Sequence, residues 1–440
     1  MRIRSGPVNG SHIVQWTLPG LTAIALLACG EPPSDAVARL KQVFATRPVV
    51  ADADNAFFDV LGFLAPAGTD PHELGMRRAT WLENARAASG DLSPDPGQPA
   101  LAVRTQRSQI LSQVVDACRA AIARACASAL ERVDDEPLSG VETLLLARYE
   151  VLLGRRGWFE IGTTHPENPL PAFDGTIEAQ RLLLIRLRRA AAAGDAAQVR
   201  ATLDRDLAFW RMALESSDVM ISKMIALAAI RQHFSFASYV LRELPAERVA
   251  EAIPAPWNQE FTAAERSLLR VMAGELLLAE EMLAAEGSSG YARLDESEDE
   301  RMAPLERLRD RLTSRARRQP DLRDIADEYL SGAMSFAVPL RQYESVSAKI
   351  GGKYADSDAG WDVPEYAMRI GSAEGMRRAA LLTAQLRSQS VPVAQLPDRL
   401  KSSPLRNPYN EQPFVWDPAD RAIVFTGPEK RKWSRQAYPY

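Results

Sequence analysis

The sequence from residue 176 to residue 245 reads TIEAQRLLLIRLRRAAAAGDAAQVRATLDRDLAFWRMALESSDVMISKMIALAAIRQHFSFASYVLRELP. Its apolar residues recur every three or four positions, which is the spacing of one face of an α-helix. Joints interrupt the pattern at Gly194-Asp195, at Ser216-Ser217-Asp218 and at Pro245. This stretch therefore predicts consecutive helices linked by short turns, and we expect Ser217 or Asp218 to cap the helix that follows.

The same periodicity continues on both sides of this stretch. It predicts an N-terminal helical region at 37–160 and a central helical region at 176–389. Helix–turn–helix units at a spacing of about 20–45 residues suggest a solenoid, but no repeated consensus of the tetratricopeptide kind is present. The predicted fold class is therefore mainly α, either an irregular multi-helix bundle or a divergent helical-hairpin array.

The segment 390–440 differs because it is rich in proline. Residues 414–416 and 422–425 have the composition of short strands, and the turn residues 417–421 separate them. We therefore expect a small C-terminal β-hairpin that packs on helices, because two strands alone are marginally stable. The basic and aromatic tail 429–440 is interpreted as a frayed terminus or as a contact for anionic headgroups.

Composition excludes several classes of protein. The chain has 440 residues, of which 46% are hydrophobic and 25% charged, with a formal net charge of −4. This balance is that of a globular protein and excludes a fibre, a fully disordered chain and a polytopic membrane protein. The acidic balance also argues against a strongly basic nucleic-acid binder, so no nucleic-acid partner is expected.

The first 29 residues have the proportions of an export signal. Arg2 and Arg4 precede an apolar run at 16–28, which is shorter than the roughly 20 residues of a membrane-spanning helix. The run ends in Leu26-Leu27-Ala28-Cys29. These four residues resemble the lipobox of bacterial lipoproteins, in which Leu stands three positions before Cys and a small residue stands directly before it. Leu27 departs from that pattern because it is bulkier than usual.

This resemblance implies that residues 1–28 are a signal peptide and that Cys29 carries lipid chains such as palmitate, followed by a tether at 29–36. Gly30 in place of Asp implies sorting to the outer membrane, with the protein facing the periplasm. The alternatives are an uncleaved anchor or a buried helix with a chance cysteine. The resemblance is confined to the signal, and no family is recognised for the mature body.

Cys118 and Cys126 could form a disulfide in an oxidising periplasm. On one continuous helix, eight residues rise about 12 Å, whereas a disulfide requires Cα atoms within about 7 Å. The intervening sequence RAAIARA favours helix. Compartment and geometry therefore disagree, and two buried thiols remain the alternative.

Two further groups of residues suggest chemistry. Asp356, Asp358 and Asp362 alternate around Gly360 as in a calcium loop, but the Glu required at position twelve is missing. We favour an exposed turn there, and we expect no metal and no cofactor. Lys223 lies in an apolar run beside Ser222 and could act as a base if burial lowers its pKa. We favour a lysine that reaches solvent or pairs with a nearby acid.

Two functions remain open. The first is an outer-membrane-tethered lipoprotein that acts without catalysis, as a binding or structural accessory protein with another envelope protein as its partner. The second is an envelope hydrolase whose carboxylate or Ser/Lys site forms only in the fold, which the 57 acidic residues allow. We expect the first, because no catalytic motif is present in the sequence.

Overall fold

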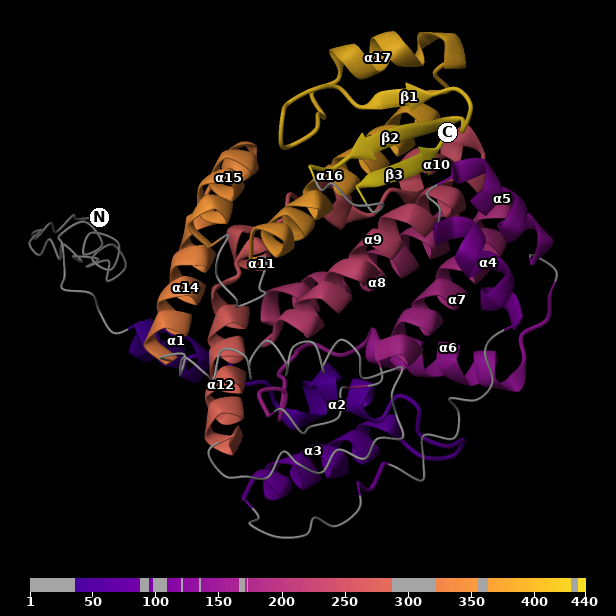
Figure 1. Ribbon diagram of the computed structural model, residues 1–440. Coiled ribbons are helices and arrows are strands. Elements are labelled where there is room, and N and C mark those ends of the chain that lie inside the picture. The colour runs from indigo at the N-terminus through magenta and orange to yellow at the C-terminus, as the bar shows by residue number, and fades with distance from the viewer. Residues whose placement is uncertain are drawn as a thin grey trace, which may run out of the picture.

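The computed structural model confirms a mainly α-helical fold with a small antiparallel sheet at the C-terminal end (Figure 1). The structure describes residues 36–87, 95–97, 109–119, 122–133, 136–165, 171, 173–286, 322–354, 363–428 and 434–440.

Helices of very different lengths form the body, and three of them exceed 20 residues. The α-helices are α1 (Ala36–Ala45), α2 (Ala56–Leu61), α3 (Pro71–Ala87), α4 (Gln109–Arg119), α5 (Ala123–Arg132), α6 (Gly140–Leu152), α7 (Phe173–Ala192), α8 (Ala196–Ser216), α9 (Met220–Glu243), α10 (Ala246–Ala252), α11 (Ala263–Arg266), α12 (Leu269–Glu286), α14 (Leu322–Ser335), α15 (Tyr343–Tyr354), α16 (Val363–Ser388) and α17 (Leu396–Ser402). Short 3-10 helices are η2 (Asp52–Asp54), η4 (Ala255–Asn258), η6 (Leu340–Gln342) and η7 (Val393–Gln395).

Helix α9 lies at the centre of the body. It packs against α7, α8 and α16, so most of its surface is covered by other helices. The joints predicted from the sequence separate these helices, and Asp195 caps α8 by accepting a hydrogen bond from the Gln198 backbone. The prediction for the start of α9 is wrong: Val219 takes the cap position without a side-chain bond. Asp218 pairs instead with two arginines, and Ser217 donates back to the Ala213 carbonyl.

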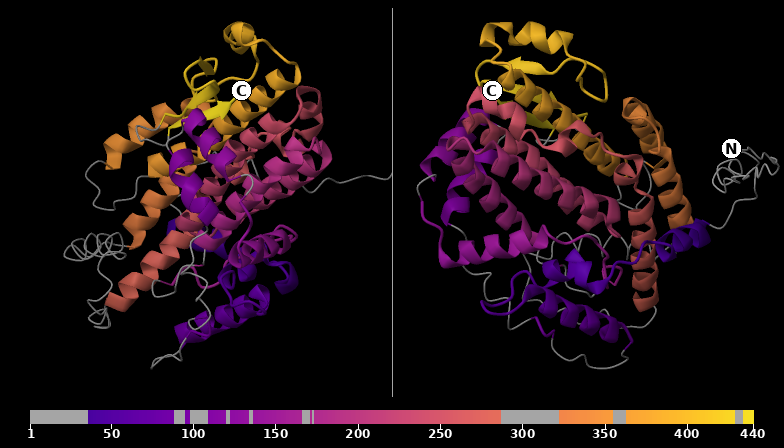
Figure 2. Two further views of the ribbon diagram at one scale, coloured as in Figure 1. Left: turned by 90° about the vertical axis from the view of Figure 1, so that its right-hand side faces the viewer. Right: turned by 180° about the vertical axis from the view of Figure 1, so that it is seen from behind.

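Two further groups of helices flank this centre (Figures 1 and 2). Helices α1, α12 and α14 pack together at one edge. Helix α2 packs on α3 and lies below the long helices in the view of Figure 1. The irregular arrangement follows from unequal helix lengths, which leave no regular stacking unit.

The Ala-rich segment before α6 forms two helices where the sequence favours one. Helix α4 ends at Arg119, and α5 begins at Ala123 after Ile122 in an extended conformation. Leu111, Val114, Cys126 and Leu130 face the core. The break brings the chain back on itself, because α4 packs on α5.

The C-terminal sheet has three strands, β1 (Val415–Asp417), β2 (Ala422–Thr426) and β3 (Arg435–Pro439), with β2 in the middle. The predicted pair is confirmed with Trp416 opposite Ile423. The interpretation of the tail as a frayed terminus is wrong, because β3 pairs with β2 and buries Tyr438. The sheet lies on α16, where a Cβ at Gly375 would come within 2.2 Å of the Phe425 ring. Glycine permits this close approach.

Candidate functional site

The predicted lipid-attachment and calcium-loop residues lie outside the described part of the chain. This holds for Cys29 and for Asp356, Asp358 and Asp362. Within the described residues, no group of His, Cys, Asp and Glu side chains has the arrangement of a metal site. Among the same residues, no helix is both long enough and apolar enough to cross a membrane.

Cys118 and Cys126 are joined by a disulfide in this structure, with their Cα atoms 4.3 Å apart. The break between α4 and α5 makes this approach possible. Ala123, at the start of α5, belongs to a small apolar cluster with Ala422, Val424 and Ala437 of the sheet. The disulfide therefore links α4 to the helix that supports the C-terminal sheet.

Among the described residues, Lys223 neither reaches solvent nor pairs with an acid, so the interpretation favoured from the sequence is wrong. Its side chain is almost fully buried, with 1% of the residue exposed, and its Nζ donates to the Leu214 carbonyl at 2.7 Å. In the described residues it has neither a carboxylate partner nor a route to solvent. Burial first, and the charge of Arg270 second, lower the pKa of Lys223 to about 7. A lysine with this pKa could accept a proton, but a substrate cannot reach it without displacement of the core.

Two acids are buried in the same region at the start of α9. Glu160 accepts a hydrogen bond from the Trp158 indole at 2.9 Å, and Glu275 accepts one from the Met220 backbone at 2.6 Å. Burial, followed by the charge of Asp218, raises the pKa of Glu160 to about 8. Burial also raises the pKa of Glu275 to about 7. This cluster joins the segment after α6 to α9 and α12 inside the protein, where it has a structural role.

A second closed group of polar side chains surrounds Asp206 on α8. The carboxylate accepts hydrogen bonds from the Tyr149 hydroxyl at 2.6 Å and from the Gln180 amide at 3.0 Å, and it contacts His233 Nδ1 at 2.7 Å. The Trp257 indole donates to His233 Nε2 at 2.9 Å. Because Nε2 accepts, the proton of the neutral ring lies on Nδ1 and is donated to Asp206. We name these residues the Asp206 network.

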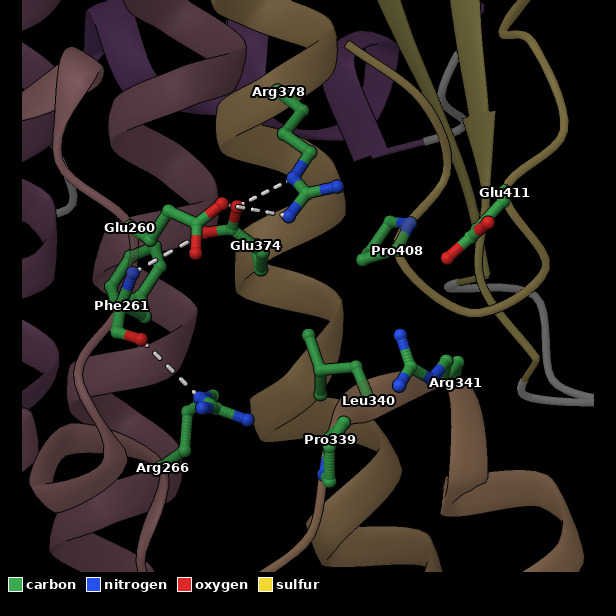
Figure 3. A pocket seen from close by; sticks show the side chains of 10 residues that line it. All are labelled: Glu260, Phe261, Arg266, Pro339, Leu340, Arg341, Glu374, Arg378, Pro408 and Glu411. Carbon is green, nitrogen blue, oxygen red and sulfur yellow. Dashed lines mark hydrogen bonds and ion pairs between the residues drawn. The ribbon is translucent and has the colours of Figure 1, made fainter. Parts of the chain in front are cut away.

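The candidate site is separate from both buried groups. It is a cavity of about 280 Å³ that opens to the surface (Figure 3). Four segments far apart in the sequence line it: 260–266 before and within α11, 339–341 at η6, 374–378 on α16, and 408–411 before the sheet. Phe261, Leu340 and two prolines give it apolar walls. Three arginines and three glutamates supply the polar groups: Arg266, Arg341, Arg378, Glu260, Glu374 and Glu411.

Bonds outside the cavity hold its walls in place. Arg211 donates to the carbonyls of Gln259 and Glu260 and pairs with Glu265, whose own capping box with Thr262 starts α11. Its guanidinium also lies over the Phe261 ring, 4.6 Å from the centroid. The segment before α11 is thus fixed by charge-assisted bonds, which are stronger than neutral ones.

The opposite wall is anchored by Asn407. Its amide donates to the Thr426 carbonyl at 3.0 Å, and its side-chain oxygen accepts from the Tyr409 backbone at 3.1 Å. Glu411 follows with a φ of 57°, a left-handed conformation that costs energy for a residue other than glycine. The loop therefore presents Glu411 at the cavity in a fixed backbone geometry.

The negative charge of Glu374 on the cavity wall is balanced by two arginines. Its carboxylate accepts bonds from Arg377 at 2.6 Å and from Arg378 at 2.6 Å, and from the Phe261 backbone at 3.3 Å. Burial acts to raise its pKa, but the hydrogen bonds and charge of Arg377 lead the contributions that lower it overall. Arg378 also pairs with Glu260, whose side chain is 71% exposed. Both acids are paired with arginines, and the lowered pKa of Glu374 means that it is not arranged as a proton donor.

Three charged groups of the cavity have no counter-ion among the described residues. Arg266 donates to the Phe261 carbonyl at 3.3 Å and is hydrogen-bonded to Tyr343, but no carboxylate pairs with it. The side chain of Arg341 and that of Glu411 have no ion pair within the same part of the chain. In Figure 3, Arg341 and Glu411 lie across the hollow from Phe261.

Sequence reasoning did not find this cavity. Its residues come from four separate segments, and none of these segments carries a motif of its own. Glu374, Arg377 and Arg378 have the three- and four-residue spacing of ordinary helix-surface ion pairs. Only the packing of η6 and of the loop before β1 onto α16 turns that common pattern into a cavity wall.

Comparison with known proteins identifies no relative. No protein-family model matches the chain, and neither the curated proteins nor the solved structures include a significant match. The function must therefore be argued from the residues themselves.

Proposed function

We propose that this protein is a lipid-anchored component of the bacterial cell envelope that works without catalysis, by binding another envelope component in the cavity on α16. The observation that carries the binding role is the cavity itself: charged groups without counter-ions line a hollow with apolar walls. Ligand sites are usually mostly apolar with a few placed polar groups, whereas charged residues dominate this lining, so the cavity suits a charged or polar ligand. The anchor part of the proposal rests on the lipobox-like residues ending at Cys29.

The state of the ionisable groups favours binding over hydrolysis. Acid–base catalysis by two carboxylates needs one that is protonated near neutral pH. The hydrogen bonds and charges of Arg377 and Arg378 lower the pKa of Glu374 instead. Lys223, the candidate base of a Ser/Lys site, is sealed in the core and bonded to a carbonyl.

The length of the tether gives the proposal a geometric consequence. The chain advances seven positions from Cys29 to Ala36, which spans at most about 25 Å when fully extended. Lipid on Cys29 would therefore keep α1 close to the bilayer, and with it the edge formed by α1, α12 and α14. The C-terminal sheet lies at another end of the molecule (Figures 1 and 2) and would face away from that edge.

The anchor is tested by the variant Cys29→Ala in the full chain. We expect the variant to leave the membrane fraction and to lose acyl labelling, whereas Cys118→Ser, which changes a cysteine of the body, keeps both. Unchanged fractionation and labelling of Cys29→Ala would contradict the anchor.

The binding role is tested by crosslinking in intact envelopes. We expect Arg341→Gln to weaken capture of a specific crosslinked partner, while Arg399→Gln on the exposed face of α17 leaves it unchanged. Equal capture by both variants would contradict a role for the cavity.

A further inference from the structure

We propose that the cavity on α16 binds a short zwitterionic peptide through its free termini, with Arg266 and Arg341 holding the carboxylate and Glu411 holding the ammonium. This inference rests on the proposed binding function and names the class of ligand. Charged groups in the cavity that already have a counter-ion have less to offer to a ligand than those without one.

Arg266 is a prepared donor for a carboxylate. Its guanidinium is half-buried and is held by the Phe261 carbonyl and the Tyr343 hydroxyl, both neutral groups. A half-buried positive charge without a carboxylate partner gains most from an anion that arrives with a ligand. A guanidinium matches the planar geometry of a carboxylate and can hold it through two parallel bonds.

The glutamates decide which kind of anion the cavity accepts. Three carboxylates line it beside the three guanidinium groups, so the lining has no net charge. A dianionic phosphate would approach Glu411 and Glu260 and would be repelled by them. A ligand that carries one carboxylate and one ammonium keeps the neutral balance and gives Glu411 a partner.

The volume limits the size of this ligand. Sites for drug-sized molecules have volumes of about 300–1,000 Å³, and this cavity of about 280 Å³ lies just below that range. It has room for an amino acid or a peptide of two or three residues. Phe261 and Leu340 offer apolar contact to small side chains on such a peptide.

The experiment is titration calorimetry on the purified full chain with alanine, dialanine and trialanine. N-acetyl-dialanine, dialanine amide and inorganic phosphate are the matched controls that lack one of the two charges or the peptide. We expect at least one of the free peptides to bind saturably, and either blocked form to bind roughly 10-fold more weakly or worse, because a bond to a charged group contributes about 1.5–3 kcal/mol.

Variants assign the two ends of the peptide. Arg341→Gln should weaken binding of the free peptide by roughly 10-fold. It should not change the weak binding of the amide, which has no carboxylate. Glu411→Gln should weaken binding of the free peptide by a similar factor without changing the weak binding of the acetylated control, which has no ammonium group. Arg399→Gln should change neither. The proposal is overturned if no free peptide binds at about 10 mM, if blocked peptides bind equally well, or if phosphate binds more tightly than the peptides.

The result can be separated from the proposed function. If peptides fail but Arg341→Gln still weakens capture of the envelope partner, the cavity binds a ligand of another class and only this inference falls. If peptides bind but Cys29→Ala stays in the membrane fraction, the anchor falls and the ligand class stands.

Discussion

The Asp206 network and the cavity on α16 both gather polar side chains from elements far apart in the sequence, but they reach opposite electrostatic outcomes. In the network, a carboxylate with no exposed surface is surrounded by Tyr149, Gln180 and His233, and each of these groups donates to it. In the cavity, Arg266, Arg341 and Glu411 line a hollow without counter-ions in the described structure.

The difference shows how a polar group is used in each place. A buried network in which every member is satisfied makes the core rigid and specific, and it has nothing left to offer to a ligand. Charged groups without counter-ions at a hollow surface weaken the fold slightly and keep their bonds for a partner. We therefore expect substitutions in the network to change stability and substitutions at the open side of the cavity to change binding.

Asp206→Ala should have the largest effect. It leaves the hydroxyl of Tyr149 and the ring proton of His233 buried without an acceptor, and because each buried donor left unsatisfied costs about 1–3 kcal/mol, we expect a loss of about 2–6 kcal/mol of unfolding free energy. Urea unfolding followed by circular dichroism measures it. The matched control is Asp204→Ala on the same helix, which loses an exposed bond from the Ala255 backbone and an exposed ion pair with Arg200 and should cost less than about 1 kcal/mol. Equal losses would show that the network is not the special element of α8.

Glu374→Gln should have the next largest effect, because this residue belongs to the wall of the cavity and not to its open side. The change leaves Arg377 and Arg378 without their shared carboxylate, and it keeps one oxygen as an acceptor. We expect a loss of about 2–3 kcal/mol in urea unfolding. Glu260→Gln is the control, since its exposed pair with Arg378 should contribute less than about 0.5 kcal/mol. A neutral result for Glu374→Gln would mean that wall and open side are equivalent.

The sequence supports the prediction of helices better than that of either polar cluster. Helical periodicity locates α7, α8, α9 and α16, because each buries an apolar face along its length. Periodicity does not say that α4 ends at Arg119, because the residues after it have high helix propensity and only tertiary packing favours the break. It also misses β3, because β3 is stabilised by pairing with β2 and not by an apolar pattern of its own.

The polar clusters escape prediction for a related reason. Tyr149, Asp206, His233 and Trp257 lie on different elements, and nothing near any one of them in the sequence indicates the others. Arg266, Arg341 and Glu411 are equally separate. The sequence indicates Lys223 because a charge interrupts an apolar run, but it does not show that the ammonium bonds to a backbone carbonyl.

The buried cluster at the start of α9 is intermediate, because it is closed to solvent but contains groups with pKa values near neutrality. Glu160 and Glu275 have raised pKa values, about 8 and about 7, so their contribution to stability is present below 4.5 and is lost as pH rises to those values. Lys223 has a pKa lowered to about 7, so its contribution is present above 10.5 and is lost as pH falls to 7.

Stability should therefore pass through a minimum between pH 7 and pH 8, where these limbs meet. We expect a slope of about 1 kcal/mol per pH unit in the free energy of unfolding for each titrating group, so the acid limb, where Glu160 and Glu275 both titrate, should be about twice as steep as the alkaline limb. Lys223→Met should abolish the alkaline limb, and Glu275→Gln should flatten the acid limb. A wild-type profile without a minimum, or variants that keep the same profile, would exclude this cluster as the cause.

Arg341→Gln should have the smallest effect on stability and so provides the strictest test of the comparison. Its guanidinium has no ion pair within the described residues, and the residue is exposed in the middle of η6. Removal of the charge should therefore change the free energy of unfolding by less than about 0.5 kcal/mol. The same variant should weaken binding of the free peptide by roughly 10-fold. Urea unfolding and peptide titration on one preparation measure both quantities, and Arg399→Gln should change neither. If Arg341→Gln lowered the free energy of unfolding by as much as it lowered the free energy of peptide binding, Arg341 would be a structural residue like Asp206. The distinction between the closed network and the open cavity would then not hold.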